Sequence, residues 1–479
     1  MSLLKKLAGE TAIYGLSSIL GRLLQFVILT PYLTRVFGRA EYGDISVLYT
    51  YAAILTVLFT YRMETAFFRF GSRDEGIERT FSTASGAILT STGILAMLML
   101  IAAEPLADLI RYPGHSNYIR LLAGIVAMDA LAAIPFARLR LENRPYRFAG
   151  IRILNIVVNI ITLFLLLEAG KGASWFREED RVAYVLLANL CASTFTVVQL
   201  LPLYRKMKIP LDGALLRRML QYAWPLVIVG LAAVVNQLIG QPMLQWLLPE
   251  EEDMGRAQAG IFSAASKIAV LMNLFTQAFN YAAEPFFFRN AGRDDAKQIY
   301  ADVAMAFTIV GCLGFLGIWL YLDLIQYLLG DQLRAGLDMA PILLMANLFL
   351  GLYYNFSIWF KLTDRTIMGA YLSVAGSVVT ILINLWLIPR YGYYGPAWAA
   401  LACYGLMAAG GYLLGRRLYP IPYAMSRMLL YIAFALSIYV LSRWIYIPQL
   451  APRLVVHTLL LGSFLALVWV RERHLLKRS

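Results

Sequence analysis

Charged side chains are scarce in this sequence: Asp, Glu, Lys and Arg together make up 15% of its 479 residues. Hydrophobic residues make up 60%, whereas soluble proteins contain about 45–50% apolar residues. A water-soluble globular protein is excluded on this ground, because only lipid solvates so large a share of apolar side chains. The formal net charge of +13 does not indicate nucleic-acid binding, since the 42 Lys and Arg are scattered over many short segments.

Cysteine and histidine are almost absent, with three residues of each type. Cys191, Cys312 and Cys403 all lie inside apolar stretches, so neither a disulfide framework nor a thiolate metal site is indicated. The histidines are dispersed without the spacing of metal ligands. Long hydrophilic loops and paired acids, which a membrane glycosyltransferase or ligase would need for catalysis, are also lacking. We therefore expect no cofactor, no metal and no enzymatic activity.

Apolar segments long enough to cross a bilayer are abundant, and a membrane-spanning helix needs about 20 residues. Lipid offers no partner to open backbone groups, so these segments are predicted to be helices, and the alternation typical of membrane barrels is absent. We predict an all-α integral membrane protein. The fourteen predicted spans are 11–34, 43–62, 81–103, 119–137, 149–169, 182–203, 220–247, 258–286, 299–325, 337–360, 367–389, 394–415, 426–446 and 452–470.

The distribution of Lys and Arg predicts how these spans are threaded. An even number of spans places both termini on the same side, and cytoplasmic loops are enriched in Lys and Arg. With a cytoplasmic N-terminus, 28 of these residues lie on the cytoplasmic side, 12 on the opposite side and two inside spans. We therefore predict that both termini are cytoplasmic.

The second predicted span is repeated in the eighth. Residues 61–74 align with residues 281–294 at an offset of 220, and seven of the fourteen positions are identical, where chance would give roughly one. A weaker match at offset 221 pairs residues 157–160 with residues 378–381. Both matches join spans that are six apart, so the halves are predicted to be parallel repeats with a cavity between them.

The repeat predicts three parts of the chain. An N-terminal six-helix lobe is expected over residues 1–206 and a C-terminal six-helix lobe over residues 207–420. The last two spans lie outside the repeat, so residues 421–479 are predicted to form an extra helix pair with a basic cytoplasmic tail.

Two cations lie inside predicted spans, Arg22 in the first and Lys267 in the eighth. A charge in the middle of a membrane costs at least about 2.5–3.5 kcal/mol, so each should face protein or a wet cavity. Because the repeat puts them in opposite halves, we predict a bipartite site for a diphosphate, with Arg62 nearer the inner end. The structural alternative is that each cation neutralises a buried carboxylate or caps helix carbonyls.

Other polar groups inside the spans are candidates for ion coupling and for the cavity lining. Asp129 could couple transport to H⁺ or Na⁺, pair with Arg22, or bond locally within the first lobe. Amide side chains at helical intervals would suit a wet, sugar-compatible lining, although hydrogen bonding between helices is the alternative. The lining candidates are Gln25, Asn155, Asn236, Gln241, Asn273 and Gln277.

The repeated segments also place an acid and an arginine at the cytoplasmic ends of spans two and eight. We predict that a Glu64–Arg69 pair and a Glu284–Arg289 pair brace an inner gate. Symmetric structural salt bridges that only anchor the helix ends are an equally good interpretation.

Several segments together carry a family resemblance: the opening residues 3–18 with Arg22 soon after, the loop at 37–43, the sequence Phe-Phe-Arg-Phe at 67–70, and residues 261–268. They resemble the bacterial polysaccharide repeat-unit (O-antigen type) flippases of the multidrug/oligosaccharidyl-lipid/polysaccharide exporter superfamily. The resemblance extends over nearly the whole chain. Its motifs are moderately specific to the family and weakly specific to the substrate.

The resemblance implies two six-helix lobes in a V around a cationic cavity that opens alternately to each side. The implied substrate is a polyprenyl-diphosphate-linked oligosaccharide for cell-surface polysaccharide such as the lipopolysaccharide O-antigen. It would be moved to the outer leaflet of the bacterial inner membrane, with polysaccharide polymerases as partners. Lipid-linked peptidoglycan-precursor flippases also have fourteen spans, but they tend to have more cavity arginines. An ion-coupled multidrug antiporter of the superfamily would favour an acidic cavity.

Overall fold

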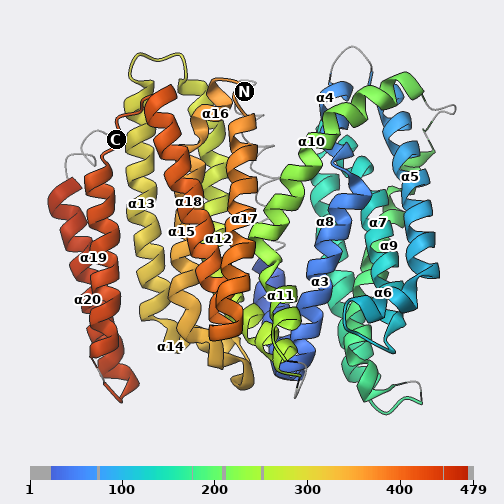
Figure 1. Cartoon of the computed structure of the whole chain (residues 1–479), viewed down its shortest axis with the longest axis horizontal. Helices are drawn as coiled ribbons and strands as arrows, with labels where there is room; N and C mark the ends of the chain where they lie inside the picture. Colours follow the sequence, from blue (N-terminus) through green and yellow to red (C-terminus); the bar gives the residue numbers. More distant parts are fainter. Residues whose placement is uncertain are drawn as a thin grey trace. The chain divides into compact units, whose positions relative to one another are not determined.

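The computed structural model describes residues 23–72, 76–174, 176–205, 207, 212–249, 253–445 and 447–472. Helices account for the regular structure in these ranges, and no strand occurs among them (Figure 1). The predicted all-α class is confirmed.

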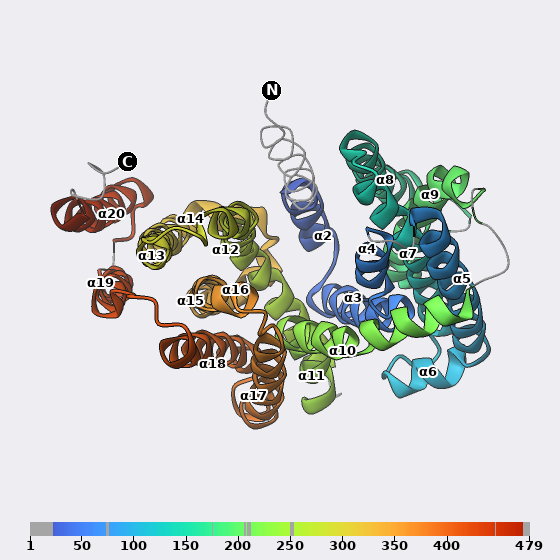
Figure 2. The same ribbon diagram turned by 90° about the horizontal axis from the view of Figure 1, so that it is seen from above.

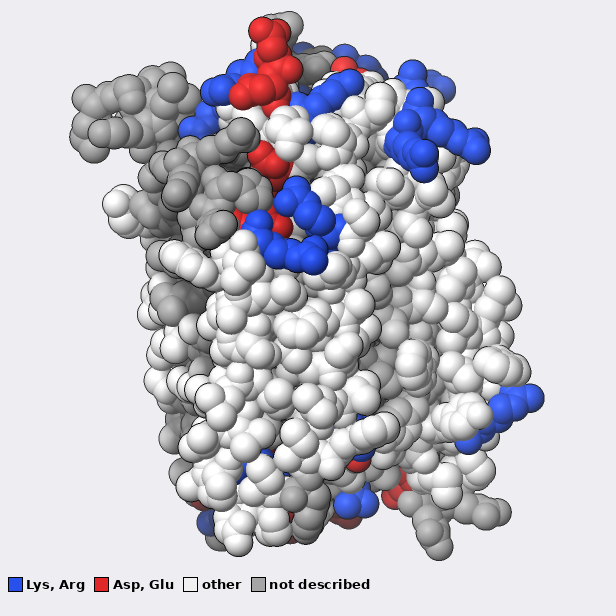
Figure 3. All heavy atoms as spheres, turned by 90° about the vertical axis from the view of Figure 1, so that its left-hand side faces the viewer, with Lys and Arg blue, Asp and Glu red and all other residues white. Residues whose placement is uncertain are grey.

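Thirteen helices in the described ranges are long and apolar enough to cross a membrane. They correspond to predicted spans two to fourteen, and the shorter apolar helix Phe26–Val36 is the described part of the first predicted span. Figure 3 shows one side of the molecule, where Lys, Arg, Asp and Glu gather toward the two ends and leave a broad belt of other residues between them. The chain is a multi-pass integral membrane protein.

The chain forms two compact units. The first contains Asp44–Val234 together with the described residues up to Leu29, and the second contains Thr30–Gly43 and the chain from Val235 onward. The helices of the first unit are α3 (Arg39–Thr60, of which the part from Asp44 belongs here), α4 (Met63–Gly71), α5 (Ile77–Ile101), α6 (Ala103–Leu109), α7 (Ser116–Leu141), α8 (Pro145–Phe164), α9 (Arg181–Tyr204) and α10 (Gly213–Leu238, up to Val234).

The second unit carries the remaining spans and the C-terminal helix pair. Its helices are α2 (Thr30–Val36), α11 (Gly240–Leu247), α12 (Met254–Asn290), α13 (Ala296–Leu320), α14 (Leu322–Ile325), the 3-10 helices η5 (Gln326–Leu328) and η6 (Asp331–Met339), α15 (Ala340–Phe356), α16 (Ile358–Leu362), α17 (Ile367–Tyr391), α18 (Tyr394–Leu418), α19 (Met425–Trp444) and α20 (Leu450–Glu472).

The segment Thr30–Gly43 lies in the second unit, although it comes early in the chain. Hydrogen bonds that attach it there include those from Arg35 Nη2 to the Tyr327 carbonyl (2.7 Å), from Arg39 Nε to the Gln332 carbonyl (2.7 Å), and from Gly330 N to Thr34 Oγ1 (3.0 Å). This short segment of the predicted N-terminal lobe therefore packs with the second unit.

The same packing pattern recurs in the two units. In the first unit α9 packs against both α7 and α8, and in the second unit α18 packs against both α15 and α17. Helices α8 and α17 correspond to the fifth and eleventh predicted spans, which the sequence repeat pairs. Outside this pattern, α19 and α20 pack against α13 at the edge of the second unit (Figure 2).

Candidate functional site

Lys267 lies within the long membrane helix α12 and is half-buried. Its neighbours on the helix, Ala264, Ala265 and Ile268, are completely buried. The Lys267 ammonium forms no hydrogen bond or ion pair with any residue in the described ranges. A membrane-embedded cation is costly unless something compensates it, so the structure presents a charge whose partner is not a described residue of this chain.

Lys267 also shares a face of α12 with the accessible residues of that helix. Ala278 and Tyr281 follow it by eleven and fourteen residues, which returns close to the same angle around a helix, and both are exposed. Leu274, seven residues after Lys267 and so close to the same angle, is buried, and every position from 268 to 277 is buried or half-buried. Lys267 itself is half-buried, so this face of α12 is packed around Leu274 and opens only toward Ala278 and Tyr281.

Two predicted lining residues on α12 form a chain of amides with α15. Gln277 Nε2 donates a hydrogen bond to Asn273 Oδ1, and Asn273 Nδ2 donates to Asn347 Oδ1 at 3.1 Å. Asn347 Nδ2 in turn donates to the Leu343 carbonyl at 2.9 Å. These amides join two helices, which was the alternative interpretation of the pattern, and all three side chains remain half-buried.

Arg62 lies at a break between helices α3 and α4 of the first unit. Tyr61 and Arg62 have positive φ angles of 32° and 56°, which non-glycine residues rarely adopt. A Cβ atom added to Gly230 of α10 would come within 2.5 Å of Arg62 Nε, so the guanidinium lies directly against this glycine. Its ion pair with Glu64 is long, at 3.7 Å. Strained backbone of this kind clusters at functional sites.

The other predicted lining amides are used within their own units. Asn155 Nδ2 of α8 donates to Thr196 Oγ1 of α9 at 2.9 Å, and buried Asn236 Nδ2 donates to the Ser373 carbonyl at 3.1 Å. Gln241 is buried in α11. The side chain of Gln25 and the whole of Arg22 lie outside the described parts of the chain, so the predicted pairing of Arg22 with Lys267 stays a prediction.

Asp129 bonds locally within the first unit, which was one of its three predicted possibilities. Ser193 Oγ of α9 donates a hydrogen bond of 2.7 Å to Asp129 Oδ1. Asn189, one turn earlier on α9, donates to the Tyr49 hydroxyl of α3 at 3.0 Å. Asp129 is the one exposed position between residues 121 and 139 of α7. The carboxylate is thus held by a neighbour and still accessible.

The structure gives the predicted gate acids different partners. Glu64 pairs with Arg62, and Glu284 Oε2 lies 2.6 Å from Lys361 Nζ, whereas Arg69 stacks over the Tyr222 ring at 4.2 Å. Glu284 forms no ion pair with Arg289 within the described ranges. Residues five apart point about 140° away from each other around a helix, so neither predicted pair can face itself.

The sequence reasoning missed a buried arginine in the first unit. Arg138 of α7 is 1% exposed, and it forms ion pairs with Glu78 of α5 and, at 2.6 Å, with Glu142. Its guanidinium also lies 4.5 Å from the centre of the Phe81 ring. The spacing of four residues between Arg138 and Glu142 was a visible signal. The partner sixty residues away could not be found without the fold.

Comparisons with known proteins agree with this architecture. The family model described as polysaccharide biosynthesis protein matches residues 7–291. A structure of the lipid II flippase MurJ in an inward closed conformation is 14% identical, with a TM-score of 0.75, and covers 97% of this chain and 99% of its own. A search of curated proteins found no significant match.

Multidrug transporters have a similar fold. An inward-facing MATE family transporter of the MOP superfamily is 14% identical with a TM-score of 0.64, and the match covers 85% of this chain and 94% of that one. A mutant of the Vibrio cholerae MATE transporter VcmN is 13% identical with a TM-score of 0.58, covering 86% and 96%. At these identities the likeness establishes a shared transporter fold.

Proposed function

Because the chain belongs to the polysaccharide biosynthesis protein family, we propose that it is a flippase for a polyprenyl-diphosphate-linked oligosaccharide. It would move this lipid from the cytoplasmic to the outer leaflet of a bacterial inner membrane by alternating access, for cell-surface polysaccharide synthesis. The single observation that carries the proposal is that the half-buried Lys267 ammonium on the membrane helix α12 has no hydrogen-bond or ion-pair partner among the described residues.

A diphosphate is the chemical group that best accounts for such a cation. Lys267 offers three N–H donors and no acceptor, so its compensating ligand must be an anion or a strong acceptor. Arg62 in the first unit is a second candidate, because its ion pair with Glu64 is long and arginine binds phosphate through two parallel hydrogen bonds. Arg22 completes the proposed set of cations. The lipid tails would remain in the bilayer.

The remaining parts of the proposal concern sugar passage and coupling. Half-buried amides such as Asn273 and Gln277 offer donors and acceptors to sugar hydroxyls as the glycan passes. Asp129 is proposed to bind the coupling ion, H⁺ or Na⁺, because its carboxylate is accessible although Ser193 holds it. A polysaccharide polymerase on the outer side is the proposed partner.

A lipid-linked peptidoglycan precursor is the second candidate substrate. The observation that favours it is the likeness to the lipid II flippase MurJ over nearly the full length of both chains. Both candidate substrates are lipid-linked glycans, so the proposed cationic site does not distinguish them. An ion-coupled drug antiporter is less well supported, since an unpartnered lysine is suited to anions.

The cationic site is tested by replacing Lys267 with methionine. We expect surface glycan to be lost in Lys267→Met cells, to be largely retained in Lys267→Arg cells, and to be normal in Lys297→Met cells, where an exposed lysine is removed. The apparent melting temperature of Lys267→Met should be equal to or above that of the wild type, because removal of an uncompensated charge relieves its cost. Normal glycan in Lys267→Met, or a large drop in melting temperature, would contradict the proposal.

The substrate class is tested separately by depleting the protein in its native host. We expect a polyprenyl-diphosphate-linked oligosaccharide to accumulate on the cytoplasmic leaflet, measured by lipid extraction and mass spectrometry. Accumulation of a peptidoglycan precursor instead would favour the second candidate. If no lipid-linked sugar accumulates, the antiporter interpretation replaces both.

A further inference from the structure

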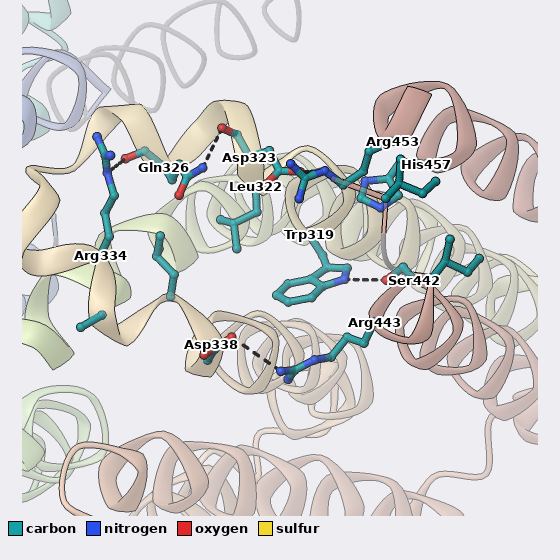
Figure 4. Close-up of a pocket in the computed structure, with 14 residues that line it drawn as sticks. Trp319, Leu322, Asp323, Gln326, Arg334, Asp338, Ser442, Arg443, Arg453 and His457 are labelled. Carbon is teal, nitrogen blue, oxygen red and sulfur yellow. Dashed lines mark hydrogen bonds and ion pairs between the residues drawn. The ribbon is translucent and has the colours of Figure 1, made fainter. Parts of the chain in front are cut away.

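A polar pocket of about 430 Å³ lies in the second unit, between the outward-predicted ends of α13, η6, α19 and α20 (Figure 4). Trp319 and Leu322 occupy its middle, and charged side chains surround them in the close-up. The other charged and polar lining residues are Asp323, Gln326, Arg334, Asp338, Ser442, Arg443, Arg453 and His457. This pocket is separate from the face of α12 that carries Lys267.

The walls of the pocket are fixed by hydrogen bonds whose acceptors are a hydroxyl and backbone carbonyls. Trp319 Nε1 donates to Ser442 Oγ at 2.9 Å, and His457 Nδ1 lies 2.6 Å from the Leu320 carbonyl. Arg334 Nε donates to two carbonyls, both at 3.1 Å. These bonds hold α13, α19 and α20 in place without using the other charges that line the pocket.

Two arginine–aspartate pairs in the pocket are loosely made. Arg443 Nη2 lies 3.7 Å from Asp338 Oδ1, with both side chains about half exposed or more (49% and 62%). Arg453 Nε lies 3.2 Å from Asp323 Oδ2, but the geometry is not that of a hydrogen bond, so this buried donor has no hydrogen-bond acceptor in the part of the chain that the structure describes. A buried unsatisfied donor is costly. Each pair could therefore accept a ligand that brings one charge of each sign.

The charge balance decides which ligand fits. Arg334, the third arginine of the lining, is paired with Asp331 outside it. The remaining two carboxylates balance the remaining two arginines, so an anion alone would be repelled by Asp323 and Asp338, and a cation alone would be repelled by Arg443 and Arg453. A group that carries a phosphate and a primary ammonium meets both requirements, because guanidinium binds phosphate and carboxylate accepts N–H donors.

The position of the pocket indicates a lipid as the source of this group. The pocket lies at the ends of the apolar helices α13, α19 and α20, where Trp444, 82% exposed, and Leu450, 40% exposed, face outward. Tryptophan is enriched at the interface between membrane and water. We propose that this pocket binds the headgroup of a zwitterionic phospholipid with a primary ammonium, of the phosphatidylethanolamine class, between the C-terminal helix pair and α13. This inference does not depend on the transported substrate.

The proposal is tested by native mass spectrometry of the full chain with three phospholipids of identical acyl chains. Phosphatidylethanolamine should be retained about tenfold more strongly than phosphatidylcholine, whose quaternary ammonium cannot donate to Asp323 or Asp338. The retention of phosphatidylethanolamine should also exceed that of phosphatidylglycerol, whose headgroup has no ammonium. Equal retention of all three, or preference for phosphatidylglycerol, would overturn the proposal.

Double variants test the binding of the ammonium and of the phosphate separately. Asp338→Asn with Asp323→Asn should reduce the preference for phosphatidylethanolamine over phosphatidylcholine to about parity and should increase binding of phosphatidylglycerol. Arg443→Gln with Arg453→Gln should weaken binding of all three lipids. The matched control is Arg293→Gln with Asp295→Asn, an exposed pair outside the pocket, which should change nothing.

A soluble competitor distinguishes the lipid from a free ligand. Phosphoethanolamine without acyl chains should not displace the bound lipid at comparable concentration. If it does, the site takes a soluble zwitterion and the lipid assignment is wrong. Unchanged lipid selectivity in the aspartate variants would likewise overturn the role given to the carboxylates.

Discussion

Lys267 and Arg138 are two cations on membrane helices, α12 and α7, and their surroundings differ. Arg138 is almost completely buried, but two carboxylates and an aromatic ring surround its guanidinium. Lys267 is more accessible and lacks any such partner within the described ranges. Two carboxylates account for the buried arginine, whereas the described residues supply no partner for the lysine, for which we propose a ligand. Substitution of each should therefore separate stability from transport.

Replacing Arg138 should destabilise the protein. Arg138→Met leaves Glu142, whose side chain is only 15% exposed, without its partner. Breaking a buried ion pair from one side costs about 3–5 kcal/mol. Thermal unfolding in detergent should show a clear drop in melting temperature for Arg138→Met. Arg140→Met is the control, because Arg140 is exposed two residues further along α7, and a similar drop there would remove the special role of Arg138.

Gly230 is expected to control the position of Arg62. Because a Cβ atom at Gly230 would lie 2.5 Å from Arg62 Nε, Gly230→Ala must push the guanidinium away while leaving the backbone in place. If Arg62 binds phosphate, transport should fall by about tenfold, the effect of losing one charge-assisted hydrogen bond. Transport is measured as surface glycan at matched protein level.

The control for this prediction is Gly93→Ala in α5, where an added Cβ meets nothing within 4 Å. It should leave both transport and stability unchanged. Full transport in Gly230→Ala would show that the position of Arg62 is unimportant. Equal losses of transport in both variants would show that an added methyl group on a helix glycine lowers transport whether or not it lies near Arg62.

At the scale of elements, the start of α3 crosses α12 with glycine on each helix. A Cβ atom on Gly43 would lie 1.9 Å from the Arg256 carbonyl oxygen, and one on Gly260 would lie 2.0 Å from the Arg39 carbonyl oxygen. Both contacts are with backbone, which cannot move aside as a long side chain can. Small residues at such crossings allow membrane helices to approach closely.

Gly260→Ala should therefore force α12 away from the segment Thr30–Gly43. We expect a melting temperature several degrees below that of the wild type, since overpacking costs about 1–3 kcal/mol. Gly405→Ala in α18, where an added Cβ meets nothing within 4 Å, is the matched control and should have no effect. An unchanged melting temperature in Gly260→Ala would show that the crossing is not close.

The start of α10 is held by a carboxylate that titrates. Leu215 N donates to Asp212 Oδ1 at 2.9 Å, and Arg79 of α5 also bonds to this carboxylate. The backbone hydrogen bond from Leu215, followed by the bond from Arg79, lowers the pKa of Asp212 below its usual range. The charged form is therefore favoured in the folded state. The charged carboxylate makes its full contribution to the free energy of unfolding at pH values above the ordinary carboxyl pKa.

This contribution should be lost as the pH falls through the lowered pKa of Asp212. Asp212→Asn keeps a side chain that can cap the helix but removes the charge. We expect its melting temperature to be below that of the wild type at neutral pH and to converge with it in strong acid, measured by thermal unfolding across pH. A difference that stays constant with pH would contradict the assignment.

The sequence could predict the helices whose length and position follow from the local pattern of apolar residues. The apolar lengths located spans such as α8 and α17, and the match between residues 61–74 and 281–294 paired α3 and α4 with α12. The break at Tyr61 and Arg62 could not be predicted, because neither residue is glycine or proline.

The site residues were harder to predict than the spans. Side-chain partners such as Lys361 for Glu284 and Glu78 for Arg138 depend on helices far apart in the sequence. A pattern of residues along one helix shows which face a charge occupies, but it does not show which neighbour lies opposite. Lys267 could be singled out as a candidate, because a lone charge in an apolar run is visible without the fold, and its role in a site stays a prediction.

At the scale of the whole molecule, the two units share a packing pattern but not every detail. The span at residues 61–62 is broken in the first unit, whereas the repeated position lies inside the continuous helix α12 in the second. The two repeats therefore differ in backbone conformation at this position. We infer that the break at Arg62 and the lysine at position 267 are the specialised features of the two repeats.

The proposed direction of transport depends on orientation, which follows from the excess of Lys and Arg on one side. In a protein whose three cysteines are replaced by serine, Ser174→Cys should react with a membrane-impermeant maleimide in intact cells, since it is exposed and predicted to be outside. Asp294→Cys, exposed beyond the end of α12, should react only after permeabilisation. The reverse pattern would place the basic loops outside, and substrate capture would then have to begin at the opposite face from the one proposed.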